Sequence, residues 1–235
     1  MPTSIITASA TRTGTENDNA DAASTYTAAT GVVGTAVIDG IGHSPGTSAL
    51  SPVLAVVAAR TAATRGALAG LLSAAQLVSD PGPDDDEPNA VSVVATTHLD
   101  GETVVAWVGD CDAYGWDGTT LARYTTPHTV GEQLRHNGAP WEIAEAHDNW
   151  IKTSLAHAVV ATIQEVTISD PVVLLLSDGI HDQIPHDDLT ALVRDHATTP
   201  QALATALVTA TTADADGYRD DATAVVISVQ SQPTT

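Results

Sequence analysis

The chain has 235 residues, of which 29 are acidic and 8 are basic, so its formal net charge at pH 7 is -21. This length suffices for one domain with a substantial core, and no apolar run approaches the roughly 18 residues that a membrane-spanning helix needs. So large a negative charge excludes broad binding to nucleic acid phosphates or to anionic membranes. The single cysteine, Cys111, excludes an internal disulfide and a cysteine-based zinc site.

The N-terminal stretch MPTSIITASATRTG is polar and rich in threonine, and it lacks the charged and apolar regions of a signal peptide. We therefore expect a cytoplasmic protein in which residues 1–235 form a single domain, with residues 1–10 and 230–235 as loose tails. The acidic excess has two interpretations. It is either a general adaptation to solubility or salt, or part of it is gathered in a site for divalent cations.

The first predicted elements are a strand and a long helix. Residues 31–40, GVVGTAVIDG, have the apolar run of a strand that ends in Asp-Gly. Residues 48–79 are rich in alanine and leucine and have a helical period, with a break near Gly66. Residues 80–89, DPGPDDDEPN, contain three prolines and five acids without the spacing of a calcium loop, so we interpret them as a solvated linker.

In the second half of the chain, the predicted strands and helices follow one another less regularly. Residues 90–99 and 102–118 read as strands that a hairpin turn joins. Later strands are expected at residues 172–176 and 222–229, and helices at residues 130–138, 139–148, 186–197 and 200–215. Because long helices are segregated from runs of hairpin strands, this order favours an α+β fold with antiparallel sheets over a doubly wound parallel sheet.

Aspartates stand at one end of four apolar strands. Three strands end at an aspartate and the last strand begins after a pair of them; these residues are Asp39, Asp110, Asp178, Asp220 and Asp221. In an antiparallel sheet the C-terminal end of one strand lies beside the N-terminal end of the next, so these side chains can converge on one edge. Clustered carboxylates cannot all stay ionised without compensation, and only Arg219 is adjacent to any of them.

A hard divalent ion is the simplest compensation for such a cluster. Oxygen ligands without Cys or paired His favour Mg²⁺ or Mn²⁺ over zinc. Glycine after the aspartate, in Asp39-Gly40 and in Asp178-Gly179, allows a sharp turn and the close approach of a backbone carbonyl to an ion. The alternative is that each Asp-Gly is an ordinary turn, and the residues alone leave the two interpretations open.

The order of four motifs resembles that of the type 2C metal-dependent serine/threonine protein phosphatases. VIDGIGH resembles the family's strand ending in Asp-Gly, and VAWVGDCDAYGWDGTTLARYTTPHTVGEQLRHNG resembles its Gly-Asp-Ser-Arg segment with the hairpin and helix that follow. LLLSDGIHDQI is similar to its Ser-Asp-Gly-Leu-x-Asp motif, and GYRDDATAVVISV is similar to its closing strand. The resemblance spans roughly residues 10–230. It implies a four-layer αββα sandwich, with two antiparallel sheets flanked by helices.

The resemblance also implies a two-metal centre at one edge of the sandwich. The positions that match its core catalytic ligands are Asp39, Asp178, Asp220 and the backbone carbonyl of Gly40. Further ligand positions are Asp21, Asp110 and Asp182, of which the last two match a third, weaker ion of many members. The implied cofactors are Mn²⁺ or Mg²⁺ ions, and the implied reaction is hydrolysis of phosphoserine or phosphothreonine in a phosphorylated protein by a water that the ions activate.

The sequence departs from the family pattern near its N-terminus. Where the family has Asn-Glu-Asp, this chain has Asn-Ala-Asp ending at Asp21, so Glu16 or Asp18 would have to replace the glutamate. Arg12 is the only arginine available for the family's phosphate-binding role, and its spacing to Asp21 is too long. These departures keep open an alternative function, a catalytically weak phosphatase-like protein that binds a partner or a signal.

Other departures fall within the later motifs. Cys111 and Asp112 stand where the family has Ser and Arg, and Asp221 stands where it has Asn. His43 is either an ordinary loop residue or a proton donor to the leaving group. His181 lies between two acids in the sequence, which predicts a raised pKa if they are close to it.

Overall fold

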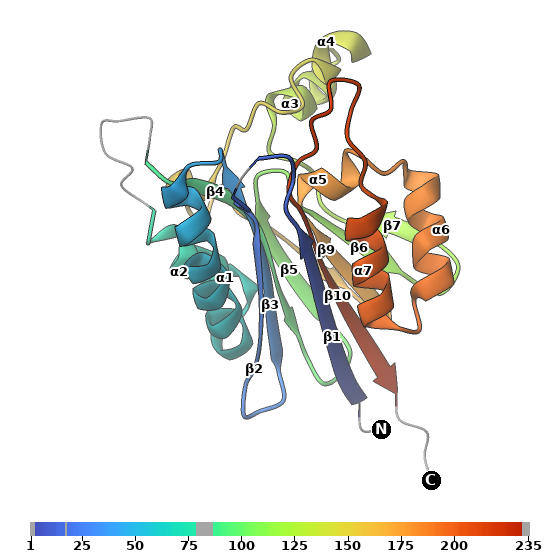
Figure 1. Cartoon of the computed structure of the whole chain (residues 1–235). Coiled ribbons are helices and arrows are strands. Elements are labelled where there is room, and N and C mark those ends of the chain that lie inside the picture. Colours follow the sequence, from blue (N-terminus) through green and yellow to red (C-terminus); the bar gives the residue numbers. More distant parts are fainter. Residues whose placement is uncertain (1–2, 17, 79–86, 232–235) are drawn as a thin grey trace.

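The computed structural model describes residues 3–16, 18–78 and 87–231 (Figure 1). Two five-stranded antiparallel sheets pack face to face, and helices cover their outer faces. The first sheet has the order β2 (Ala22–Thr27), β3 (Val33–Ile41), β4 (Asn89–Thr97), β5 (Thr103–Val108) and β8 (Gln164–Ile168). The second has the order β1 (Thr3–Arg12), β10 (Ala222–Ser231), β9 (Val172–Leu176), β6 (Asp112–Trp116) and β7 (Leu121–Arg123). The expected α+β sandwich is confirmed.

The helices form two outer layers and one projecting group. The first sheet is covered by α1 (Pro45–Arg65) and α2 (Ala67–Ala75), and the second by α6 (His186–His196) and α7 (Pro200–Ala210). At the upper edge in Figure 1 lie α3 (Val130–His136), α4 (Trp141–Glu145) and α5 (Asp178–His181). The short 3-10 helix η1 (Leu155–His157) packs against α2 and β4. No helix among the described residues is long and apolar enough to cross a bilayer.

Strand β9 shows how the continuous apolar run forms the core. All five of its residues are buried, and they alternate between two layers. Leu174 and Leu176 pack with the helices of the second sheet, whereas Val173 and Leu175 face the first sheet across the middle of the sandwich. A strand covered on both faces needs apolar side chains at every position, which explains the uninterrupted run.

The predicted break in the long helix is confirmed at Gly66. Helix α1 ends at Arg65, Gly66 has a φ of 96°, and α2 begins at Ala67. Ser44 caps the start of α1, since its side chain accepts a hydrogen bond from the Thr47 backbone N–H. Residues 80–86 of the expected linker lie outside the described residues, and Asn89 already belongs to β4.

The expectation of a loose N-terminal tail is wrong for residues 3–10. They belong to β1, which pairs with β10 along its whole length, from Thr3 opposite Ser231 to Arg12 opposite Ala222. The pairing also includes residues 230 and 231, and residues 232–235 lie outside the described residues. The strand escaped prediction because it is an edge strand of small polar and β-branched residues, which needs backbone pairing more than an apolar face.

Candidate active site

The register of both sheets places the predicted aspartates at one edge, the upper edge in Figure 1. In the first sheet Ala22 pairs with Ile38, so Asp21, directly before β2, lies at the same level as Asp39 near the end of β3. In the second sheet Leu176 pairs with Ala224, so the end of β9 lies beside the start of β10. Strand ends that are far apart in the sequence therefore meet, as antiparallel pairing predicts.

The aspartates at this edge repel one another. Burial, together with repulsion from Asp178, Asp21, Asp110 and Asp220, raises the pKa of Asp39 well above its usual range. Burial also raises the pKa of Asp178 to about 7, and Asp110 and Asp220 add to this shift. Burial raises the pKa of Asp110 to about 6. The edge is thus a centre of negative charge, which His181 offsets only in part at Asp110 and Asp178.

Asp39 has the least compensated carboxylate of the centre. Its Oδ2 atom is buried and accepts no hydrogen bond. A carboxylate oxygen can only accept, so leaving it buried without a donor or a cation costs free energy. The next residue must be glycine, because a Cβ on Gly40 would lie 2.5 Å from Thr47 Cγ2 and 2.7 Å from the Ala20 carbonyl oxygen.

Asp21 is held by a residue of the other sheet. The Ser177 hydroxyl donates to Asp21 Oδ2 at 2.7 Å and accepts a hydrogen bond from the Thr223 backbone N–H at 2.9 Å. Burial raises the pKa of Asp21 and the bond from Ser177 opposes this rise. Sequence reasoning did not assign a role to Ser177, although its place directly before Asp178-Gly179 was the available signal.

Replacing Ser177 by Ala is expected to destabilise the protein by roughly 1–3 kcal/mol, because it leaves a buried N–H and a buried carboxylate oxygen without their partner. Thermal unfolding followed by circular dichroism should show a melting temperature lower by several degrees. Ser48→Ala is the control, since among the described residues the Ser48 hydroxyl, in the first turn of α1, bonds only to the Ser44 carbonyl. Equal shifts for both variants would contradict a special role of Ser177.

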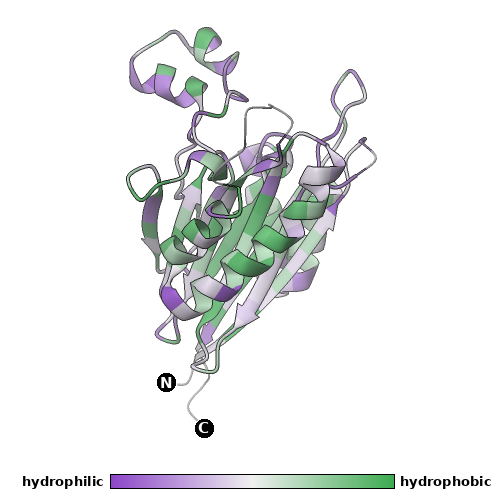
Figure 2. Cartoon of the chain, turned by 90° about the vertical axis from the view of Figure 1, so that its left-hand side faces the viewer, coloured by the Kyte–Doolittle hydropathy of each residue, from purple (hydrophilic) through white to green (hydrophobic). Residues whose placement is uncertain are grey.

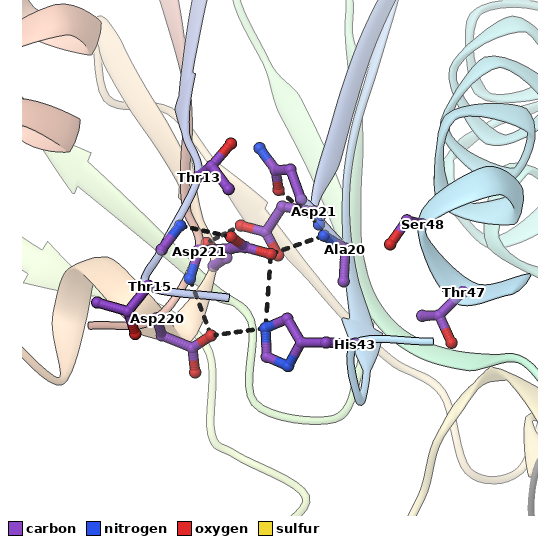
Figure 3. A network of polar contacts seen from close by, with 12 residues as sticks. Thr13, Thr15, Ala20, Asp21, His43, Thr47, Ser48, Asp220 and Asp221 are labelled. Carbon is purple, nitrogen blue, oxygen red and sulfur yellow. Dashed lines mark hydrogen bonds and ion pairs between the residues drawn. The ribbon is translucent and has the colours of Figure 1, made fainter. Parts of the chain in front are cut away.

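Asp221 ties the N-terminal segment to the start of β10. Its Oδ1 accepts from the Gly14 N–H at 2.7 Å and its Oδ2 from the Ala20 N–H at 2.6 Å. An asparagine could not accept both bonds with its two terminal atoms, which gives the departure from the family a physical reason. His43 Nε2 lies 3.7 Å from Asp220 Oδ1 and 3.7 Å from Asp221 Oδ2 (Figure 3). His43 therefore belongs to the acidic edge, although it comes from the loop that follows β3.

His181 lies among acids, as its sequence position predicted. Its Nδ1 atom is 3.0 Å from Asp182 Oδ1, and its Nε2 atom is 3.1 Å from the backbone oxygen of Asp110. Burial lowers the pKa of His181, but Asp112, Asp182 and Asp178 outweigh this effect and raise it to about 9. Asp182, a position matching a third-ion ligand, is thus paired with a cation of the chain itself.

Asp112 is the centre of a buried polar network below this edge. It is completely buried, and it accepts hydrogen bonds from Arg123 Nη2 at 2.7 Å, the Thr125 hydroxyl at 2.7 Å and the Tyr114 hydroxyl at 3.3 Å. The family has arginine where this chain has Asp112. Here Arg123 on β7 supplies the positive charge that pairs with the buried Asp112 carboxylate.

The edge fits a divalent cation in its chemistry. Its side chains offer carboxylate oxygens, which Mg²⁺ and Mn²⁺ prefer, and Asp39 Oδ2 is buried without any partner. In residues 3–16, 18–78 and 87–231, however, no three Asp, Glu, His or Cys side chains are already gathered as an ion site. Repulsion between neighbouring carboxylates contributes to the raised pKa values of Asp39 and Asp178, and a cation would offset this repulsion.

Comparison with known proteins identifies the fold. No protein-family model and no curated protein matches this sequence. Among solved structures, the serine/threonine phosphatase of S. agalactiae superposes with a TM-score of 0.81 at 17% identity, covering 96% of this chain and 100% of that one. The PPM Ser-Thr phosphatase MsPP from Mycobacterium smegmatis, in complex with cacodylate, gives 0.71 at 23% identity, covering 96% and 99%. The chain has the fold of these phosphatases.

A third structure supports the same fold. The serine/threonine phosphatase PstP/Ppp from Mycobacterium tuberculosis superposes with a TM-score of 0.69 at 19% identity, covering 95% of this chain and 98% of that one. The two chains therefore share the phosphatase fold over nearly their whole lengths.

Within the phosphatase fold, Arg12 does not lie free for a phosphate. Its Nη1 donates to the carbonyl oxygens of Thr211 at 2.9 Å, Thr209 at 3.3 Å and Val208 at 3.4 Å. These contacts stabilise the C-terminal end of α7, where helix carbonyls lack partners and carry partial negative charge. We therefore assign Arg12 to the end of α7 and not to phosphate binding. Glu16 and Asp18, the possible replacements for the missing glutamate, are both exposed.

Proposed function

We propose that this chain is a metal-dependent phosphatase that hydrolyses phosphoserine or phosphothreonine monoesters in proteins. The observation that carries this proposal is the buried, unpartnered Asp39 Oδ2 among aspartates whose pKa values are raised by burial and mutual repulsion. The shared fold with proteins described as serine/threonine phosphatases supports it.

Asp39, Asp178 and Asp220 would hold two Mn²⁺ or Mg²⁺ ions together with the backbone carbonyl of Gly40, and Asp21 lies beside them. Two such ions would supply the chemistry of lowering the pKa of a water and of offsetting charge on the phosphoryl group. Because the nucleophile is water, the chain needs no reactive Cys or Ser of its own.

The remaining groups of the site position these ligands. Asp221 holds the backbone N–H groups of Gly14 and Ala20, so the segment before Asp21 lies against β10. Ser177 holds the Asp21 carboxylate from the other sheet. For a third ion only Asp110 and Asp182 remain, and Asp182 is already paired with His181.

The proposal predicts that turnover depends on a divalent ion. After dialysis against a chelator, the full chain should not hydrolyse p-nitrophenyl phosphate, and added Mn²⁺ or Mg²⁺ should restore turnover, because without a cation the repelling carboxylates cannot activate water. A phosphothreonine peptide should be hydrolysed under the same conditions. Turnover that persists in the presence of the chelator would contradict the proposal.

A second candidate function is a phosphatase-like protein that binds a partner without catalysis. The engagement of Arg12 by α7 favours it, since the acidic edge then lacks the arginine that the family uses for phosphate. The two functions are distinguished by one comparison. A rise of the melting temperature with Mn²⁺, without any turnover, would support the binding protein.

A further inference from the structure

A cavity of about 330 Å³ opens between the aspartate edge and the projecting helices α3 and α4. One of its walls contains Asp110, His181 and Asp182. The opposite wall comes from α3, α4 and the segment after them, and includes Glu132, Arg135, Trp141 and Asp148. Asp110 belongs both to this cavity and to the group of carboxylates that act on Asp39. A molecule that reaches the acidic edge therefore has this cavity beside it.

Each cation in the cavity wall is already paired with a carboxylate. The pairs are Arg123 with Asp112 at 2.7 Å, Arg135 with both oxygens of Asp148, and His181 with Asp182 at 3.0 Å. The Arg135 guanidinium also lies over the Trp141 ring, 4.7 Å from its centroid. The positive charge of each of these side chains is therefore already balanced by a carboxylate of the chain itself.

Acidic side chains on the helices remain in excess. Glu132 is only 3.4 Å from Arg135 Nη1, a guanidinium that Asp148 already engages with both oxygens. Glu142 and Glu145 on α4 are exposed, and neither forms an ion pair within the part of the chain that the structure describes. This wall therefore favours a positively charged neighbour, in line with the net charge of -21.

Apolar side chains lie next to these acids. Trp141 is 61% exposed and Ile143 is 51% exposed, both on α4, and Trp150 is 60% exposed shortly after it. Figure 2 shows hydrophobic and hydrophilic residues alternating on this projecting part of the molecule. Of these three, Trp141 lines the cavity itself, so the cavity offers an exposed aromatic surface beside its acids.

We propose that this cavity binds the part of the substrate chain beside the phosphorylated residue, and that it selects segments with lysine or arginine there. The inference rests on the proposed function and adds the class of substrate. Basic side chains can place their ammonium or guanidinium groups against Glu132 and their aliphatic stems against Trp141, both of which line the cavity. They also offset the repulsion between the phosphate and the acidic surface.

Three phosphothreonine peptides of equal length test the inference, with arginine, glutamine or glutamate beside the phosphothreonine. We expect kcat/KM to fall in the order arginine, glutamine, glutamate, and the differences to shrink as salt is added, because salt screens exposed charges. Equal values, or a preference for glutamate, would overturn the inference. Hydrolysis of p-nitrophenyl phosphate reports on the proposed function separately. If no substrate is turned over, binding of the same peptides by fluorescence anisotropy decides the inference alone.

Two variants locate the effect in the cavity. Glu132→Gln and Trp141→Ala should each lower the ratio of kcat/KM for the arginine peptide to that for p-nitrophenyl phosphate by roughly two- to fivefold, the range of an exposed charge contact. Glu102→Gln, an exposed acid in the turn between β4 and β5 at the opposite end of the sheets, is the matched control. An equal change in the control would show that only the overall charge acts, and would overturn the assignment to the cavity.

Discussion

Replacing Asp178 by Asn is expected to abolish Mn²⁺-dependent hydrolysis of p-nitrophenyl phosphate while leaving the fold intact. The change keeps the shape of the side chain and removes one charge from a centre in which burial and neighbouring carboxylates raise its pKa to about 7. We therefore expect no decrease in the free energy of unfolding. The site, in contrast, loses an anionic oxygen for an ion, and we expect turnover to fall on the order of 100-fold or more.

The matched control for this variant is Asp187→Asn, which changes an exposed aspartate in the first turn of α6. Initial rates over a Mn²⁺ titration and thermal unfolding curves should be recorded for both variants and the wild type. If Asp178→Asn retains most of the wild-type rate at saturating Mn²⁺, Asp178 is not an ion ligand and the proposed site is wrong.

The metal-free protein is expected to be more stable at pH 5 than at pH 7.5, by about 5 °C in melting temperature. Burial and repulsion raise the pKa values of Asp39, Asp110 and Asp178, so the folded state binds their protons more tightly than the unfolded state does. Stability then falls as the pH rises from the ordinary carboxyl range through the folded values of about 6 and 7. Differential scanning calorimetry in the presence of a chelator measures this dependence.

Two comparisons distinguish the effect of these aspartates on the pH dependence of stability from the effect of the other acidic residues. Asp39→Asn removes one of the repelling charges, so its melting temperature should change less between pH 5 and pH 7.5 than that of the wild type. Added Mn²⁺ should raise the melting temperature more at pH 7.5 than at pH 5, since protons compete with the ion for the carboxylates. A pH dependence that is the same in Asp39→Asn would place its cause elsewhere in the molecule.

The strands and helices that carry strong local patterns could be predicted from the sequence. The apolar run of β9 and the alanine-rich helix broken at Gly66 are examples. Burial of a strand on both faces requires a continuous apolar run, and a positive φ favours glycine, so both features are visible in the sequence. The meeting of strand ends at one edge could also be predicted, since antiparallel pairing alone requires it.

Features that depend on distant partners could not be predicted in this way. Strand β1 contributes few apolar side chains to the core, such as Ile5, and is defined mainly by its pairing with β10, more than 200 residues away in the sequence. The Arg12 guanidinium is engaged by the end of α7, and Arg123 supplies the charge that Asp112 needs. Nothing near these residues in the sequence indicates the partner, because each contact is set by how the sheets and helices pack.

The pairing of β1 with β10 also affects when the molecule can be completed during synthesis. Among the described strands, β1 is an edge strand whose single neighbour in the sheet is β10. The segment before β10 carries Asp220 and Asp221. A ribosome-bound chain from which β10 has not yet emerged therefore contains Asp39 and Asp178 without Asp220 and Asp221. Strand β1 can pair with β10 only after β10 has been synthesised, and we expect the aspartate edge to be assembled at the same stage.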